Sequence, residues 1–144
     1  GNTIEASLGA GSRWRGESPL IGEFGVQTLG DGSITGTGPM FRGANMELGK
    51  MAVLRISGVE ILVSSKKMQL ADQSIFRHLG IEPASRSILV LKSSVHFRAD
   101  FTELAGEIIV AAAPGPNPAN NLDLPFENVR PGIRLAPRGP ILQT

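Results

Sequence analysis

The sequence predicts an α+β fold that is rich in β-structure, with a mixed sheet of about six or seven short strands, two short helices and a proline-rich C-terminal arm. The 144 residues include 18 Gly and 10 Pro, which favour short strands joined by tight turns over a helical bundle. Strand-length apolar runs recur between these turns, whereas apolar residues at helical spacing occur in two stretches. The length suits a single domain spanning residues 1–144.

The first half of the chain predicts two β-hairpins. Residues 20–38 alternate apolar with polar or small side chains on both sides of Gly30-Asp31-Gly32, which supplies a turn. The second hairpin spans residues 51–63, where a short apolar run leads through Ser57-Gly58 into a returning strand.

A short helix is predicted after the second hairpin. Asp72 is a favourable N-cap residue, because its carboxylate can accept a hydrogen bond from an N–H group of the first turn. Ile75, Phe76 and Leu79 fall on one helix face, and Gly80 is a typical C-terminal stop.

The second half of the chain predicts a buried strand, another helix and a last strand. Residues 88–91 are continuously apolar, which is typical of a central strand covered on both faces. The spacing of Phe97, Phe101 and Leu104 indicates a helix, and residues 108–110 form the last strand. Seven of the ten prolines follow residue 113, so residues 114–144 are predicted to form an extended arm that wraps the domain.

Charge and composition argue against several classes of function. The formal net charge is +1, from 14 Lys and Arg against 13 Asp and Glu, so we expect neither nucleic acid nor an anionic membrane as a partner. No apolar run approaches the roughly 18 residues of a membrane span, and the sequence starts without a signal-peptide pattern. The absence of Cys removes disulfides, thiolate zinc sites and cysteine nucleophiles. We expect a cytoplasmic location, although a secreted protein poor in Cys would look the same.

Polar and basic side chains concentrate where the predicted central strand leads into the second helix. The candidates for substrate binding are Lys92, Ser93, Ser94, His96 and Arg98. Helix N-termini bind anions through exposed N–H groups, and ligands gather beyond the carboxyl ends of strands in open sheets. A histidine at this corner also titrates near neutral pH. The alternative is that a serine caps the helix while the histidine and the arginine are solvated.

A complete metal centre is not expected within this chain. A catalytic zinc takes three protein ligands, and the sequence offers two histidines, His78 and His96, and no Cys. His96 and Asp100 are four residues apart and could supply two ligands from one helix face. The third would have to be a distant carboxylate such as Glu103 or Asp123.

One longer string, Lys92-Ser93-Ser94-Val95-His96-Phe97-Arg98-Ala99, stands out among several short ones. The others are Gly38-Pro39-Met40, Leu48-Gly49, Ala52-Val53-Leu54-Arg55, Gly58-Val59, Phe76-Arg77, Gly80-Ile81-Glu82-Pro83, Leu124-Pro125-Phe126 and Arg130-Pro131. In their order and spacing these stretches resemble the C-terminal domain of the MlrC family of metallopeptidases, which is named for a microcystin-degrading enzyme.

The resemblance implies that this chain is a fragment of a longer hydrolase, in agreement with its start at Gly1-Asn2-Thr3 rather than Met. The missing N-terminal domain of the same chain would carry the histidines and carboxylates that hold zinc, so no cofactor is expected here. The implied activity of the parent is metal-dependent hydrolysis of a peptide or peptide-like amide, with linearised microcystin as the family's named substrate. This chain would complete the active-site cleft and contact the substrate through residues 92–98, and would be inert alone.

A second hypothesis comes from a different class of protein. The chain would be a non-catalytic scaffold or dimerisation module, in which the hairpin of residues 51–63 pairs across the interface of a homodimer. His96 would then have no role in binding. The two hypotheses differ in whether the side chains of His96 and Arg98 converge in a concave pocket or point apart into solvent.

Overall fold

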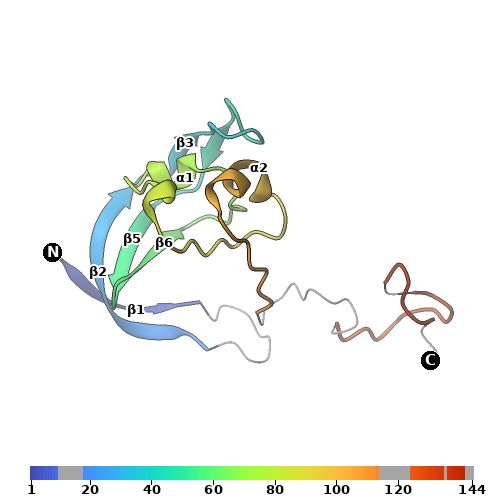
Figure 1. Cartoon of the computed structure of the whole chain (residues 1–144). Helices are drawn as coiled ribbons and strands as arrows, with labels where there is room; N and C mark the ends of the chain where they lie inside the picture. The colour runs from blue at the N-terminus through green and yellow to red at the C-terminus, as the bar shows by residue number, and fades with distance from the viewer. Residues whose placement is uncertain (10–17, 114–123, 135, 142–144) are drawn as a thin grey trace. The chain divides into compact units, whose positions relative to one another are not determined.

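The structure is a computed structural model that describes residues 1–9, 18–113, 124–134 and 136–141 (Figure 1). It divides into two units, one made of Gly1–Ser7 with Ile21–Ile108 and the other of Leu8–Leu20 with Ile109–Thr144. The second unit contains a bridge between Arg134 and Ile141. Much of the predicted arm, including residues 114–123, lies outside the described residues, so the arm stays a prediction.

The described residues contain six strands, two short α-helices and two 3₁₀ turns, which confirms the predicted α+β class rich in β-structure. A four-stranded sheet has the order β1-β2-β5-β6, and β3 and β4 form a separate pair. The strands are β1 (Thr3–Leu8), β2 (Leu20–Gly30), β3 (Ser33–Thr35), β4 (Asn45–Glu47), β5 (Met51–Ile56) and β6 (Val59–Ser64). The pairings of β2 with β5, β5 with β6 and β3 with β4 are antiparallel.

The predicted hairpin at residues 51–63 is confirmed as β5 and β6. Their register runs from Met51 opposite Ser64 to Ile56 opposite Val59. Ser57 and Gly58 form the two-residue turn, with φ values of 47° and 83°. Positive φ at both positions is the backbone of a type I′ turn, whose twist matches that of antiparallel strands.

The predicted hairpin at residues 20–38 is wrong, although both of its strands exist. β2 pairs with β5, whereas β3 pairs with β4 in the other sheet. Gly32, at φ 74°, is packed so closely that a Cβ there would lie 2.0 Å from the carbonyl oxygen of Gly49. Its own carbonyl accepts a hydrogen bond from Leu48 N at 2.8 Å. The glycine turn therefore carries the chain from one sheet into the other. The prediction failed because an alternating pattern identifies a strand but does not identify the strand it pairs with.

The predicted helix exists as α1 (Ser74–Arg77), but its N-cap position is held by Gln73 rather than by the predicted Asp72. The Asp72 carboxylate accepts a hydrogen bond from Ser74 N at 2.9 Å. Gly80 has φ 75°, and Ile81 N donates to the carbonyl of Phe76 at 3.1 Å, which closes the helix as a Schellman motif. His78, the residue after the last one of α1, accepts a hydrogen bond through Nε2 from Gly32 N at 3.3 Å and so connects the helix end to the glycine turn.

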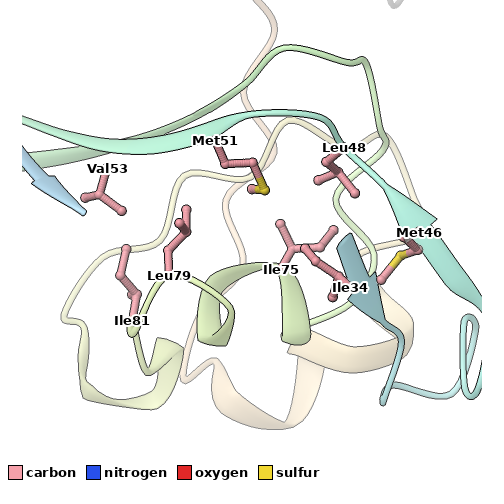
Figure 2. Close-up of a cluster of buried hydrophobic side chains, with 8 residues drawn as sticks. All are labelled: Ile34, Met46, Leu48, Met51, Val53, Ile75, Leu79 and Ile81. Carbon is pink, nitrogen blue, oxygen red and sulfur yellow. The ribbon is translucent and has the colours of Figure 1, made fainter. Parts of the chain in front are cut away.

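The core lies between α1 and the two sheets (Figure 2). Its buried side chains come from β3, β4, the turn between β4 and β5, β5, α1 and the segment after α1: Ile34, Met46, Leu48, Met51, Val53, Ile75, Leu79 and Ile81. The second helix, α2 (Arg98–Phe101), continues into a 3₁₀ turn at Thr102–Leu104. Phe101 is buried, and its ring meets that of Phe76 edge to face with centroids 6.0 Å apart. Helix α2 therefore packs on the outside of α1.

The strands predicted at residues 88–91 and 108–110 are wrong. Neither segment belongs to a strand, and Figure 1 draws both as irregular chain. Ile88 and Val90 are 82% and 90% exposed. An apolar run becomes a buried strand when neighbouring strands supply hydrogen bonds and cover both faces, whereas here no described strand pairs with residues 88–91 and Ile88 and Val90 are left uncovered. The central place in the sheet is taken by β5, with β2 on one side and β6 on the other.

Candidate functional site

The predicted corner, residues 92–98, is a loop that leads into α2. Ser93 accepts a hydrogen bond through Oγ from Phe97 N at 3.2 Å, so this serine restrains the loop before the helix. No central strand precedes the corner, and α2 has only four residues. The corner therefore lacks both features that were expected to bind an anion, the carboxyl end of a strand and the N-terminus of a full helix. What remains is the set of side chains themselves.

Two of the predicted side chains are brought together by a residue that sequence reasoning missed. Gln69 Oε1 lies 2.6 Å from His96 Nδ1, and Gln69 Nε2 donates to Ser94 Oγ at 3.4 Å. The Gln69 amide therefore contacts both the imidazole of His96 and the hydroxyl of Ser94. No sequence signal links Gln69 to His96, which lies 27 positions later.

The basic residues of the corner lie apart from this group. The Arg98 guanidinium stacks over the Phe97 ring, 5.1 Å from its centroid, and both Arg98 and Lys92 are exposed. A hollow of about 180 Å³ is lined by Pro39, Gln73, Ala99, Asp100, Glu103 and Leu104, and by none of the five predicted residues. The prediction that residues 92–98 bind substrate therefore stays a prediction.

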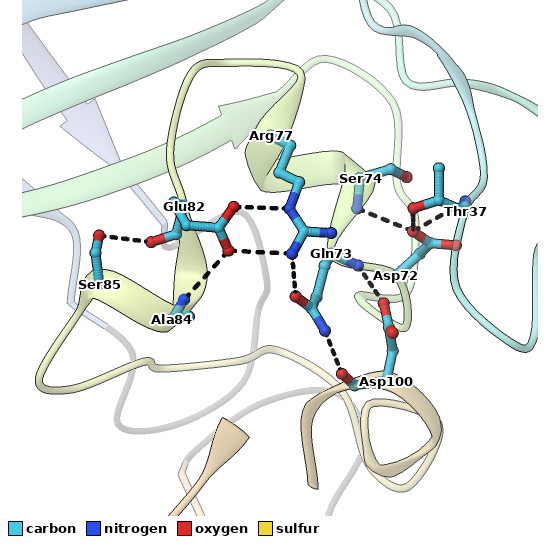
Figure 3. A network of polar contacts seen from close by, with 9 residues as sticks. All are labelled: Thr37, Asp72, Gln73, Ser74, Arg77, Glu82, Ala84, Ser85 and Asp100. Carbon is cyan, nitrogen blue, oxygen red and sulfur yellow. Dashed lines mark hydrogen bonds and ion pairs between the residues drawn. The ribbon is translucent and has the colours of Figure 1, made fainter. Parts of the chain in front are cut away.

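A buried carboxylate, Asp72, joins the loop after β3 to the start of α1 (Figure 3). It accepts hydrogen bonds from Gly38 N at 2.8 Å and Ser74 N at 2.9 Å, and longer ones from Thr37 N and Oγ1 at 3.4 and 3.5 Å. Burial disfavours the charge, but these hydrogen bonds together outweigh it and lower the pKa of Asp72 below its ordinary value. The sequence predicted the bond to the helix and not the bonds to residues 37–38.

A second carboxylate, Asp100, meets the same place from α2. Its Oδ2 accepts a hydrogen bond from Gln73 N at 2.7 Å, and its backbone carbonyl accepts from Gln73 Nε2. A Cβ at Gly38 would lie 2.6 Å from Asp100 Oδ2 and 3.1 Å from Asp72 Oδ2. Only glycine leaves room for both carboxylates at this point. Gly38 is therefore a packing requirement of this junction between the loop after β3, the start of α1 and α2.

The junction continues across α1 as an ion pair (Figure 3). Arg77 donates from Nε and Nη2 to the two carboxylate oxygens of Glu82 at 2.9 and 3.0 Å. The same Nη2 donates to Gln73 Oε1 at 2.7 Å. These hydrogen bonds lower the pKa of Glu82. Both side chains of the pair are about half exposed, so the pair orients Gln73 more than it stabilises the fold.

The His, Asp and Glu side chains that the structure describes do not form a zinc centre, and Asp123, named above as a possible third ligand, lies outside the described residues. Across the described residues, no group of three or more His, Asp or Glu side chains is placed to hold a metal ion. His96 precedes α2, so it does not share a helix face with Asp100. Each also has a partner of its own, Gln69 and Gln73. The described residues are therefore given no role in holding a catalytic metal.

Comparison with known proteins decides the family. Residues 1–128 match the family described as MlrC C-terminus. The chain belongs to this family. It is 29% identical over 114 residues to microcystinase C of Sphingomonas sp, covering 76% of this chain and 22% of that protein. A crystal structure of a Mesorhizobium sp. BNC1 protein, named "Putative metallopeptidase", shares its fold with a TM-score of 0.78 at 24% identity.

That match covers 90% of this chain and 26% of the other. The chain thus spans about a quarter of the length of the relatives it matches. Among the described residues, no helix is long and apolar enough to cross a membrane.

Proposed function

We propose that this chain is the C-terminal part of an MlrC-like, zinc-dependent peptidase or amidohydrolase, that it completes the active-site cleft of the parent, and that residues 92–98 contact the substrate there. Membership of the MlrC C-terminal family supports the parent activity. The name of the relative microcystinase C supports an amide-containing, peptide-like substrate. In this proposal the N-terminal part holds the zinc, which agrees with the lack, among the described residues, of three His, Asp or Glu side chains placed to hold a metal ion.

The observation that carries the site is the hydrogen bond between Gln69 and His96. An exposed histidine on a loop would ordinarily sample several orientations, but the 2.6 Å contact holds this ring in one. The other ring nitrogen, Nε2, can exchange a hydrogen bond with a substrate group, and an imidazole held there can pass a proton to a leaving amine. Arg98, exposed nearby in the sequence, can clamp a carboxylate or a developing oxyanion with paired N–H donors.

Substitution of either residue in the full-length parent tests the proposal. Removing one preorganised donor costs roughly a hundred- to a thousand-fold in rate. We therefore expect His96→Ala and Arg98→Ala to lower kcat by that factor while the melting temperature and the bound metal stay unchanged. Arg42→Ala, an exposed arginine between β3 and β4, is the matched control. Full turnover in both stable variants would end the substrate-contact proposal.

The alternative role as a dimerisation module is favoured by one feature of the sheet. β6 is an edge strand, so one side of it carries no neighbouring strand among the described residues, and its Val59 is exposed. Pairing of two β6 edges would make a symmetric dimer. Sedimentation of the parent with Val59→Lys discriminates between the two roles. The module role requires the dimer to dissociate and activity to fall only with the amount of folded protein.

A further inference from the structure

Residues 87–92 form an apolar stretch that the described residues leave uncovered. Ile88 and Val90 are among the most exposed apolar side chains in the described structure, at 82% and 90%. Within the described residues, the N–H groups of residues 88–92 donate no backbone hydrogen bond. Exposed apolar side chains and unpaired strand backbone both favour association with a partner.

The stretch nevertheless has the side-chain pattern of a strand. Leu89 and Leu91 are half-buried whereas Ile88 and Val90 are exposed, so exposure alternates with a period of two. Its N-terminal side is held near β6, because Arg86 makes an ion pair of 2.8 Å with Glu60. At its C-terminal side, Ser93 N donates to the carbonyl of Leu91 at 3.0 Å. One face is therefore covered by this chain, and the other face and the backbone are available to a partner.

We propose that residues 87–92 are a docking strand, to which a strand from the N-terminal part of the same protein adds by β-augmentation. This inference rests on the proposed function, in which the chain is the C-terminal part of a longer hydrolase. The occupant is inferred from the length of the relatives. This chain covers 22% and 26% of them and matches the family described as MlrC C-terminus, so we take most of their length to precede the matching region.

An occupant from the same polypeptide fits the energetics of this surface. A short strand face with two exposed aliphatic side chains is too small to bind a separate protein tightly. A covalently linked partner is present at a high effective concentration, so the same small surface is enough. Addition of a strand supplies backbone hydrogen bonds to residues 88–92 and buries Ile88 and Val90 in one step.

Hydrogen exchange measured on the 144-residue chain and on the full-length parent tests the docking strand. We expect the amides of residues 88–92 to exchange at least a hundred-fold more slowly in the parent, while the turn at Ser57-Gly58 exchanges alike in both. Equal rates at residues 88–92 would overturn the inference. Protection that appears in the short chain as its concentration rises would also overturn it, in favour of a second copy.

A pair of variants of the parent separates this inference from the proposed function. Val90→Lys places a charge in the docking face and should abolish the protection of residues 88–92, with the circular dichroism spectrum unchanged. Leu29→Lys, an exposed apolar residue of β2, is the matched control and should leave the protection intact. If Val90→Lys keeps the protection, the docking strand is wrong. The proposed function is judged independently, by the turnover of His96→Ala.

Discussion

Removal of the buried Asp72 carboxylate should destabilise the fold far more than removal of an exposed carboxylate such as that of Asp31. Asp72 is fully buried, and its hydrogen bonds join residues 37–38 to the start of α1. Asp72→Ala would leave the N–H groups of Gly38 and Ser74 buried without an acceptor. Since each hydrogen bond to a charged group contributes about 1.5–3 kcal/mol, we expect a loss of about 3–6 kcal/mol from these two bonds.

Equilibrium urea unfolding, followed by the far-UV signal, measures this loss. With an m-value of about 2 kcal/mol/M, the unfolding midpoint should fall by about 2 M. Asp31→Ala is the control, because Asp31 is largely exposed and should cost less than about 1 kcal/mol. If Asp72→Ala does not fold, Asp72→Asn retains one oxygen acceptor and should show a smaller, measurable loss.

The reasoning is refuted if Asp72→Ala and Asp31→Ala shift the midpoint equally. That result would mean that the donors around Asp72 find other acceptors, or that water reaches them. A large shift for both aspartates would also refute the expected difference between their unfolding midpoints, because Asp72 is buried and Asp31 is largely exposed.

Three further predictions follow from single contacts. Because the pKa of Asp72 is lowered in the fold, its stabilisation is complete above the unfolded value and is lost as pH falls through the folded one, so midpoints measured below pH 4 should fall more steeply for wild type than for Asp72→Asn. Gly32→Ala should unfold at clearly lower temperature than Gly43→Ala, since both have positive φ but only Gly32 is sterically blocked; equal melting temperatures contradict this. Gln69→Ala should change the imidazole chemical shifts of His96 in NMR spectra and increase the motion of its ring, whereas an unchanged spectrum would show that Gln69 does not hold it.

Short-range signals in the sequence predicted the elements whose structure depends on neighbouring residues. The turn at Ser57-Gly58 fixes its own hairpin, because two positive φ values bring the flanking strands together. Asp72 and Gly80 likewise mark the ends of α1, because capping involves residues a few positions apart. The motif at residues 92–98 identified a family but not a geometry, since the partner of His96 lies 27 positions earlier.

Long-range pairing could not be predicted from these local signals. The strand pattern of β2 is compatible with any antiparallel neighbour, and the close packing of Gly32 against Gly49 decides against β3. At residues 88–91 the sequence predicted a strand that the described structure does not contain. Their apolar run requires cover, but a sequence does not say whether the cover comes from the same domain or from another part of the protein.

The proposed docking strand and the proposed substrate corner are consecutive in the chain and meet at Lys92. The corner is held on its own side by the Ser93–Phe97 and Gln69–His96 hydrogen bonds. Its other side begins at residues 87–92, whose backbone has no strand partner among the described residues. Catalytic groups must be held within about 0.5 Å of their productive positions, and a strand partner on residues 87–92 would restrain the segment that leads into the corner. Docking of the N-terminal part would therefore bury Ile88 and Val90 and at the same time add a restraint on the side of the corner opposite to the Gln69–His96 contact.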